Sequence, residues 1–236
     1  MRGLRCVLAV LVVTSSAGCG VSGVTLAAPT TTPSAVPPLS SQAQAAGFVD
    51  VRSVVPDAVV DLRYATANNF VGAPMYPPDA RCLVDQSMAP GLAAAAGALR
   101  PDVLVFWDCY RPHDVQVRMW EAVPNPDWVA RPGPYARSHE AGRSVDSTFA
   151  SRQQQCPPGR QISALCLADM GTDFDDFTSR ANAFATQGVS AEQQANRARL
   201  RSAMSTGGLT VYKGEWWHFD GAGAYAQRPI LDVPVN

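Results

Sequence analysis

The feature that most constrains the fold is a long N-terminal stretch without charge. No Asp, Glu, Lys or Arg lies between Arg5 and Asp50. About a quarter of the residues in a typical soluble domain are charged, so this stretch is not an ordinary part of a folded surface. We therefore expect the 236-residue chain to combine a processed and flexible N-terminal part with one folded domain, residues 47–236.

The first residues follow the order of a secretory signal peptide. Arg2 and Arg5 precede an apolar run from Cys6 to Val13, and small residues come next. The run is about half as long as the roughly 20 residues that a membrane-spanning helix needs. Residues 1–18 are therefore predicted to be a signal peptide, and the alternative is an ordinary buried N-terminal helix.

Cys19 is a candidate for lipid attachment. Ser16, Ala17 and Gly18 directly precede it, which resembles a bacterial lipobox with Ser16 in place of the usual Leu. In such a sequence the cysteine is diacylated and becomes the mature N-terminus. We therefore expect membrane tethering through Cys19 at the outer face of the cytoplasmic membrane, with secretion after cleavage near Ala28 as the alternative.

Residues 19–46 have the composition of a flexible linker. This segment contains four prolines and many Thr, Ser and Ala residues, and it offers little apolar surface to bury. Such a linker would hold a folded domain away from a membrane or cell wall.

The composition of the whole chain excludes two classes of protein. Apolar residues make up 47% of the chain, which is enough for a core and excludes a wholly disordered protein. The 19 basic and 20 acidic residues nearly balance, which argues against nucleic-acid binding because that function needs a strongly basic face.

Four cysteines lie in the predicted domain, and in an exported protein they indicate two disulfides. They allow three pairings, of which we favour Cys82–Cys109 and Cys156–Cys166. The second pair would close a short loop rich in Pro and Gly. The alternative, a metal cluster, lacks the CxxC spacing that is typical of such sites.

Hydrophobic patterns predict a mixed α+β domain. Strands are expected over residues 59–64, 103–107, 209–212 and 216–219. Helices are expected over residues 86–99, over 113–122, and from a capping box of Ser190 and Gln193 to about Gly207. Because strands and helices do not alternate regularly, we expect a single compact α+β domain with a mainly antiparallel sheet flanked by helices.

Two of the three histidines lie in dense polar segments. His139 and Asp146 belong to SHEAGRSVD, and His218 ends the segment GEWWH. Two imidazoles and one carboxylate form a zinc ligand set that leaves a fourth position for water, which is the arrangement of catalytic zinc sites. A nearby carboxylate is then needed to pass the proton of that water to a leaving amine, and Glu215 is the candidate.

The spacing of these residues requires breaks in regular structure. His139 and Asp146 are seven residues apart, and Glu215 is three residues from His218. In a regular strand each pair would therefore point to opposite faces of the sheet. A turn at Gly142, and a position of Glu215 outside the strand or at a bulge, would bring these side chains together.

Three other conspicuous residues are interpreted as structural. His113 follows Pro112 at the start of a predicted helix, with Asp114 as its only nearby acidic residue, and we expect it to be a packed or surface residue. Trp216 and Trp217 are expected to form core and site walls.

An ordered series of motifs spans most of residues 48–236, and together the motifs are highly specific. They are DLRYAT at 61–66, NFVG at 69–72, Tyr76, RCL at 81–83, DCYRP at 108–112, SHEAGRSVD at 138–146, MGTDFD at 170–175, Asn196-Arg197 and EWWH at 215–218. In this order they resemble the zinc D-alanyl-D-alanine dipeptidases of the vancomycin-resistance type. The wider group includes D-alanyl-D-alanine carboxypeptidases and the hedgehog signalling domain.

The resemblance implies a role for each matching residue of the reaction centre. One Zn²⁺ per chain would be bound on the sheet by His139, Asp146 and His218. Glu215 would be the general base and acid. Arg111 would stabilise the oxyanion that forms when hydroxide attacks the amide carbonyl, since its guanidinium is always charged and offers several donors.

Two further residues match positions that bind the substrate. Asp175 is expected to help hold the free amino group of a small D-amino-acid dipeptide. Ser138, beside the first zinc ligand, is expected to contact the terminal carboxylate or to orient the site.

The resemblance therefore implies an exported zinc metallopeptidase that hydrolyses D-Ala-D-Ala. One alternative is a zinc D,D-carboxypeptidase acting on peptidoglycan stem peptides, which export favours. Another is a zinc-dependent binding module without catalysis. Three features depart from the family: the tethered N-terminus, the segment CPPGRQISALC, and Cys109, which stands where many relatives have a small residue.

Overall fold

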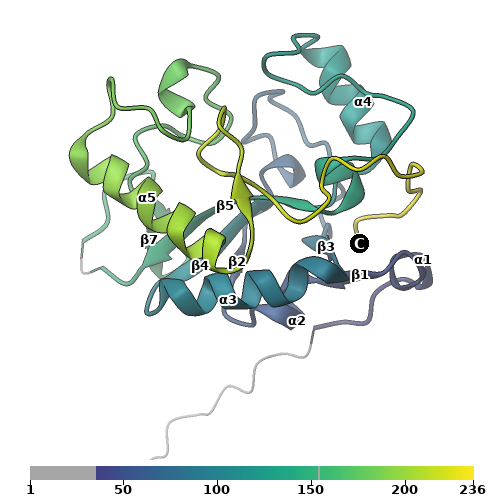
Figure 1. The fold of residues 1–236 in the computed structure, drawn as a ribbon, viewed down its shortest axis with the longest axis horizontal. Helices are drawn as coiled ribbons and strands as arrows, with labels where there is room; N and C mark the ends of the chain where they lie inside the picture. Colours follow the sequence, from purple (N-terminus) through teal and green to yellow (C-terminus); the bar gives the residue numbers. More distant parts are fainter. Residues whose placement is uncertain (1–35, 154) are drawn as a thin grey trace, which may run out of the picture. The chain divides into compact units, whose positions relative to one another are not determined.

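The computed structural model of the protein describes residues 36–153 and 155–236 (Figure 1). The predicted signal peptide, Cys19 and the first part of the predicted linker lie outside the described residues. The helices are α1 (Ser41–Ala45), α2 (Val51–Val54), α3 (Ala89–Leu99), α4 (His113–Ala122) and α5 (Ala191–Thr206). The strands are β1 (Phe48–Asp50), β2 (Val59–Val60), β3 (Leu83–Asp85), β4 (Val103–Asp108), β5 (Ser144–Ser151), β6 (Gln161–Ile162), β7 (Leu165–Leu167), β8 (Thr210–Val211) and β9 (His218–Asp220).

The main sheet is built around β4 and β5, which are both buried along most of their length. Its order is β2-β4-β5-β7-β6, and β9 pairs with the first residues of β5 and with β8. Among the described strands, β2 and β4 run parallel and the other neighbours run antiparallel, and β1 and β3 form a small second sheet. The predicted α+β domain with a mainly antiparallel sheet flanked by helices is confirmed.

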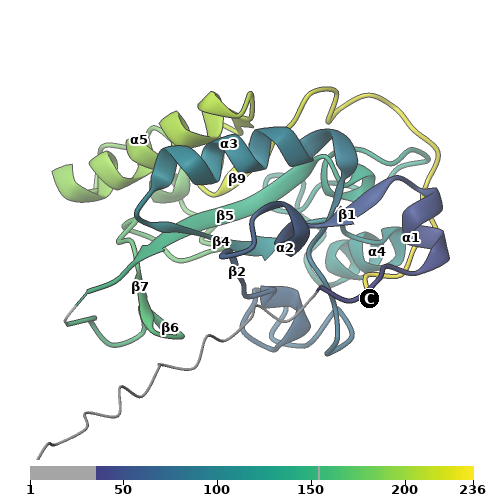
Figure 2. The same cartoon turned by 90° about the horizontal axis from the view of Figure 1, so that it is seen from below.

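Helices α3 and α5 lie side by side over one face of the β4–β5 pair in both views (Figures 1 and 2). Gly91, near the start of α3, lies against Gly207, the residue directly after α5. A Cβ atom on either glycine would collide with the carbonyl oxygen of the other. Glycine at both positions is therefore what allows the two helices to pack this closely.

Several predicted elements form with the expected boundaries. The helix over 113–122 is α4, and the helix over 86–99 is a short 3-10 turn followed by α3. The predicted capping box is present at the start of α5. The Gln193 amide donates to the Ser190 hydroxyl at 3.2 Å, and the Ser190 amide donates to the Gln193 side chain at 2.9 Å.

Three predicted strands are shorter than expected. Strand 59–64 ends at Val60, because Arg63 and Tyr64 lie in a 3-10 turn in which the Ala65 amide donates to the Leu62 carbonyl. Strand 209–212 forms only over Thr210–Val211. Strand 216–219 begins only at His218, because the Trp216 amide donates to the Ala181 carbonyl and not to a neighbouring strand.

The folded part begins before Gly47, because residues 36–46 pack on the domain. Ala43 of α1 is fully buried, and the Ser40 hydroxyl caps this helix by accepting from the Ala43 amide at 3.1 Å. The Arg81 guanidinium binds the carbonyls of Pro37 and Pro38 at 2.8 and 2.9 Å. Residues 36–46, which the prediction assigned to the flexible linker, are thus part of the folded domain. None of the helices within the described ranges has the length and apolar character needed to span a membrane.

Both favoured disulfides form. Cys82 and Cys109 have Cα atoms 5.2 Å apart, and those of Cys156 and Cys166 are 5.5 Å apart. The first disulfide is buried and joins the start of β3 to the end of β4. The second closes the segment that contains β6 at the far end of β5 (Figure 2).

Candidate active site

A cavity of about 470 Å³ lies where β5, β9 and the end of β4 meet. All the residues that the sequence predicted for the site line this cavity. They are Arg111, Ser138, His139, Asp146, Asp175, Glu215 and His218. The fold therefore gathers residues that lie as much as 107 positions apart in the chain, 111 to 218, around one space.

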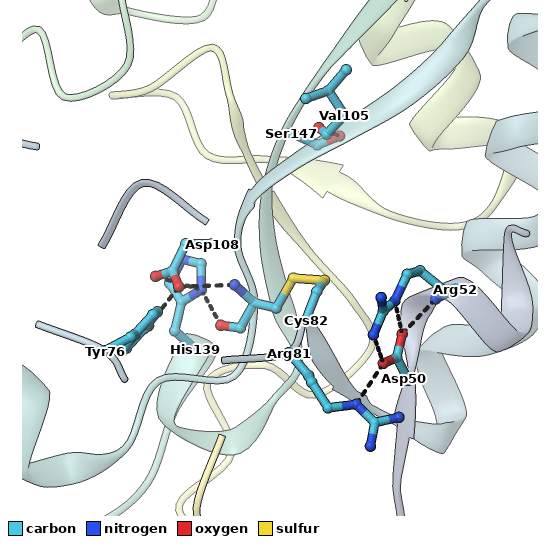
Figure 3. Close-up of a disulfide and its surroundings, with 10 residues drawn as sticks. Asp50, Arg52, Tyr76, Arg81, Cys82, Val105, Asp108, His139 and Ser147 are labelled. Atoms are coloured by element: carbon cyan, nitrogen blue, oxygen red, sulfur yellow. Dashed lines mark hydrogen bonds and ion pairs between the residues drawn. A yellow bond between two sulfur atoms is a disulfide. The ribbon is translucent and has the colours of Figure 1, made fainter. Parts of the chain in front are cut away.

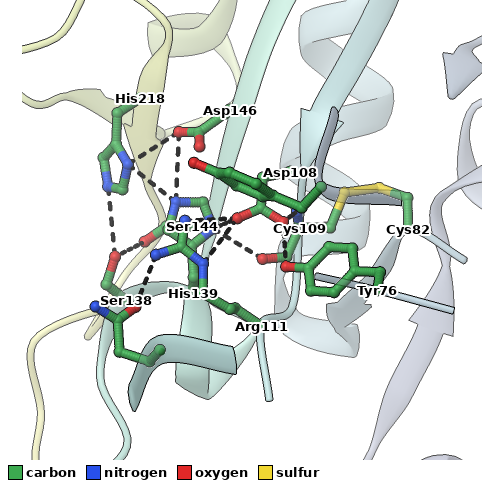
Figure 4. Close-up of polar contacts among 12 residues, drawn as sticks. Tyr76, Cys82, Asp108, Cys109, Arg111, Ser138, His139, Ser144, Asp146 and His218 are labelled. Atoms are coloured by element: carbon green, nitrogen blue, oxygen red, sulfur yellow. Dashed lines mark hydrogen bonds and ion pairs between the residues drawn. A yellow bond between two sulfur atoms is a disulfide. The ribbon is translucent and has the colours of Figure 1, made fainter. Parts of the chain in front are cut away.

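Three buried ligand atoms converge at the cavity wall (Figure 4). The Nε2 atom of His139 is 3.1 Å from Nδ1 of His218 and 3.3 Å from Oδ1 of Asp146. Nδ1 of His218 is 3.0 Å from the same oxygen. Tetrahedral zinc with bonds of about 2.0–2.1 Å separates its ligand atoms by about 3.3 Å, so this triangle fits such an ion.

Local structure brings the three side chains together as the sequence predicted. His139 lies in the 3-10 turn Ser138–Ala141, and Asp146 lies on β5 directly opposite His218 of β9. Between the first two, Gly142 has φ of +63°, and a Cβ atom there would collide with the Phe48 ring. Only glycine makes this left-handed turn without strain, and the turn redirects the chain so that His139 faces Asp146.

The outer nitrogen of each imidazole is held by an acceptor. Nδ1 of His139 donates to the Cys109 carbonyl at 2.8 Å, and Nε2 of His218 donates to Asp220 at 3.0 Å. Asp220 is itself held by the hydroxyls of Ser144 and Tyr225, at 2.6 and 2.8 Å. These bonds orient the rings so that the inner nitrogens face each other and a carboxylate, which is the arrangement of a metal site.

The charges around the three ligand atoms favour a cation between them. Burial lowers the pKa of His218, but hydrogen bonds to Asp146 and Asp220 raise it to about 10. Burial raises the pKa of Asp146, and the adjacent imidazoles of His139 and His218 bring it well below its usual range. A metal ion would supply the same positive charge without a proton.

Glu215 lies in the turn before β9, outside the strand as predicted. Its Oε2 atom is 3.8 Å from Nδ1 of His218, so the carboxylate adjoins the ligand triangle. Burial raises the pKa of Glu215 to about 6, although the positive charge of His218 opposes this. A carboxylate with this pKa can both accept and release a proton near neutral pH.

Arg111 is anchored by residues that sequence reasoning missed. Its Nε and Nη2 atoms donate to the buried Oδ2 of Asp108 at 3.0 and 2.6 Å, and Nη1 donates to Gln116 at 2.7 Å. The guanidinium carbon also lies 5.3 Å from the centre of the Tyr64 ring. Asp108 belongs to the DCYRP motif, so its position in the motif was the available signal.

Asp175 and Ser138 both line the cavity and both have positive φ, +57° and +52°. The Tyr64 hydroxyl donates to the two carboxylate oxygens of Asp175 at 3.0 and 3.2 Å. Burial, together with the charge of Asp146, raises the pKa of Asp175 well above its usual value. The Ser138 hydroxyl donates to Ser144 at 2.9 Å.

The residues interpreted as structural occupy the surroundings of the cavity. Trp217 forms part of its wall, and Trp216 packs in the core against Trp107 with ring centroids 5.7 Å apart. His113 has a partner that the sequence did not reveal, because its Nδ1 atom lies 2.6 Å from the Glu140 carboxylate. Asp114 is therefore not its acidic partner.

Comparison with known proteins places the chain in a family. The family model described as D-ala-D-ala dipeptidase matches residues 44–236. A D-alanyl-D-alanine dipeptidase of Escherichia coli (strain K12) is 31% identical over 186 residues, which cover 78% of this chain and 89% of the relative. A protein of the same name from Enterococcus faecium is 26% identical, and the match covers 80% of this chain and 98% of the relative. Another from Streptomyces coelicolor is 30% identical, and the match covers 73% of this chain and 90% of the relative.

The family match includes every residue of the cavity described above. The sequence similarity and the His/Asp/His group lead to the same conclusion: the chain belongs to the D-Ala-D-Ala dipeptidase family, and it is a metallopeptidase.

Proposed function

We propose that the protein is an exported zinc peptidase that hydrolyses the dipeptide D-Ala-D-Ala. The observation that carries the proposal is that a zinc-type ligand set, Glu215, Arg111 and Asp175 line one cavity. A binding module without catalysis would not need both the carboxylate and the guanidinium beside the ligands. The dipeptidases among its relatives support the choice of substrate.

His139, Asp146 and His218 would hold the zinc. Their spacing and the two inward-facing imidazole nitrogens fit a tetrahedral ion with one position left for water. When bound, zinc acts as a Lewis acid and lowers the pKa of water to about 7. The remaining steps depend on the side chains around it.

Glu215 would transfer the proton in this reaction. It would accept a proton from the attacking water and deliver it to the nitrogen of the leaving D-alanine, which breaks the amide bond. Its raised pKa of about 6 suits both halves of this transfer. Meanwhile Arg111 would donate to the oxygen that becomes negative in the tetrahedral intermediate.

Asp175 would bind the free ammonium group of the dipeptide and so exclude longer peptides. Its carboxylate has a neutral donor in Tyr64 and lies in a cavity that raises its pKa, so a positive ligand is favoured there. A stem peptide carries an uncharged amide at the same position and would leave the carboxylate unpaired. A site built to bind a polar group of its substrate typically has a kcat/KM about 10⁴–10⁵ lower for an analogue that lacks this group.

A substrate panel tests the proposal. Zinc-loaded protein should release D-alanine from D-Ala-D-Ala, with kcat/KM at least about 10⁴-fold above that for N-acetyl-D-Ala-D-Ala and for a pentapeptide stem. L-Ala-L-Ala and mixed dipeptides test the stereochemistry in the same assay. Preference for the pentapeptide would indicate a D,D-carboxypeptidase, and no hydrolysis of any substrate by the zinc-loaded protein would refute the peptidase mechanism.

The proposed export is supported by the two disulfides, since such bonds persist mainly in oxidising compartments. The signal peptide would then direct export, and lipid attached to Cys19 would hold the enzyme at the outer face of the cytoplasmic membrane. Metabolic labelling with a fatty acid, followed by cell fractionation, checks this location. Unlabelled protein in the culture medium would favour simple secretion.

The hydrogen bond between Asp220 and His218 predicts an effect on metal affinity that can be measured without an activity assay. We expect Asp220→Asn to lower zinc affinity about 10–100-fold, because a neutral amide is a weaker acceptor for His218 Nε2 and no longer increases the basicity of the inner nitrogen. Titration against a competing chelator measures the change. The control is Asp79→Asn, which changes an exposed carboxylate that binds the side chain of the C-terminal residue. An unchanged zinc affinity in Asp220→Asn would show that Asp220 does not contribute to metal binding.

A further inference from the structure

The short segment from Asp108 to Arg111 supplies three separate groups to the site. Asp108 anchors the guanidinium of Arg111, and the Cys109 carbonyl accepts the bond from His139. The register of β4 against β5 shifts between Phe106 and Asp108, and the residues after Asp108 have left the strand. The position of this irregular segment therefore sets the position of a metal ligand and of a catalytic arginine.

The backbone of Cys109 is not held by a sheet ladder. Its amide donates to the side chain of its own neighbour, Asp108, at 2.9 Å. Its carbonyl accepts from the ring of His139 at 2.8 Å. The neighbouring amides are used differently: that of Tyr110 donates to the Leu83 carbonyl, and that of Arg111 donates to the His139 carbonyl at 3.1 Å. Cys109 is therefore linked to the start of β3 by its covalent bond to Cys82, beside the hydrogen bond from the Tyr110 amide to the Leu83 carbonyl.

Cys82, by contrast, lies in a well-anchored part of the structure (Figure 3). Its carbonyl accepts from the Val51 amide at 2.9 Å. The preceding residue, Arg81, donates to the buried carboxylate of Asp50 at 2.8 Å, and the following residue, Leu83, pairs with Asp50 in the small sheet. Both cysteines are buried, with 0% and 1% of their surface exposed.

We propose that the Cys82–Cys109 disulfide is a positioning element of the metal site. It ties the Cys109 carbonyl to the anchored start of β3 and so keeps the His139 ring aimed at the other two ligands (Figure 4). The identification of the bound metal as zinc rests on the proposed function. Because the sulfurs are buried, the bond acts as a permanent support and not as a switch that reductants outside the protein reach.

The second disulfide provides a matched control. Cys156–Cys166 also joins two segments of the same domain, but neither cysteine lines the cavity. Cys166 pairs with Ser151 at the opposite end of β5 from Asp146. Removing this bond should lower the stability of the fold and leave the segment 108–111 in place. Comparison of the two disulfide variants therefore separates general stabilisation from positioning of the site.

The test compares the variants Cys82→Ala/Cys109→Ala and Cys156→Ala/Cys166→Ala. We expect the first to weaken zinc binding roughly 10-fold and to lower kcat more than it changes KM. The second should keep its zinc affinity within about twofold even where its Tm falls. Competition with a chelator gives the dissociation constant, and steady-state kinetics on D-Ala-D-Ala give the other two values.

A readout without metal separates this inference from the proposed function. In zinc-free protein, NMR should show the Nδ1 proton of His139 exchanging with solvent faster in Cys82→Ala/Cys109→Ala than in the wild type or the control variant. If the first variant does not fold, Cys82→Val/Cys109→Ala, which refills the volume of the lost sulfur, takes its place. Equal zinc affinity and equal proton exchange in the two disulfide variants would overturn the proposal, whether or not the wild type hydrolyses D-Ala-D-Ala.

Discussion

Glu215→Gln is expected to reduce kcat on D-Ala-D-Ala by about 10²–10⁴ while zinc remains bound. Glutamine has nearly the same shape as glutamate, so the turn before β9 and the ligand His218 keep their positions. The amide, however, cannot accept a proton from water or return one to the leaving amine. Steady-state kinetics and metal analysis of the same preparation measure the two parts of this prediction.

Glu121→Gln is the control for this variant. Glu121 is an exposed glutamate near the end of α4 and does not line the cavity, so its loss should leave kcat and zinc content unchanged. Loss of zinc from Glu215→Gln would show a structural effect on the ligands. A kcat within tenfold of the wild type would exclude Glu215 as the proton-transfer group.

Arg111→Lys is expected to lower kcat by about 10²–10³, the usual effect of removing an oxyanion donor. Arginine carries five N–H donors, of which two bind Asp108 and one binds Gln116, so two remain for the cavity. A lysine ammonium is a point charge that cannot bind Asp108 and still reach the substrate oxygen with the same geometry. The loss should appear in kcat more than in KM, because the negative oxygen forms only in the transition state.

Lysine is the informative replacement because Asp108 is fully buried. An uncharged residue at position 111 would leave this carboxylate without its partner, which costs about 3–5 kcal/mol in stability. Arg199→Lys is the control. Arg199 lies on the exposed side of α5 and pairs with Asp102, and lysine at this position retains the positive charge. An Arg111→Lys variant with a normal kcat would show that the guanidinium does not stabilise the oxyanion.

Local sequence determined much of the scaffold. The capping box at Ser190, the helix that follows Pro112 and the apolar strand β4 depend on residues close in the chain, so their patterns were sufficient. The motif series also singled out the three residues of the candidate metal site from residue type and order alone. Spacing further required a turn between His139 and Asp146, and Gly142 provides it.

The longest of the described strands, β5, escaped prediction because more than half of its buried side chains are polar. Ser147 and Thr148 of β5 are fully buried, and the Ser147 hydroxyl is satisfied by the Val105 carbonyl of β4. An apolar–polar alternation therefore does not mark the strand. Its existence depends on β4, β7 and β9 pairing around it, and such pairing is not visible from one segment.

The sequence by itself determined which side chains are candidates for the reaction chemistry, because metal ligands and proton-transfer groups are defined by residue type and by an ordered motif series. Tertiary structure alone decided what supports them: Asp108 behind Arg111, Tyr64 on Asp175, and Asp220 and Cys109 behind the two imidazoles. These partners lie on different strands and turns, and hydrogen bonding depends on distance and direction in space. Neither quantity is encoded in the spacing of residues along one chain.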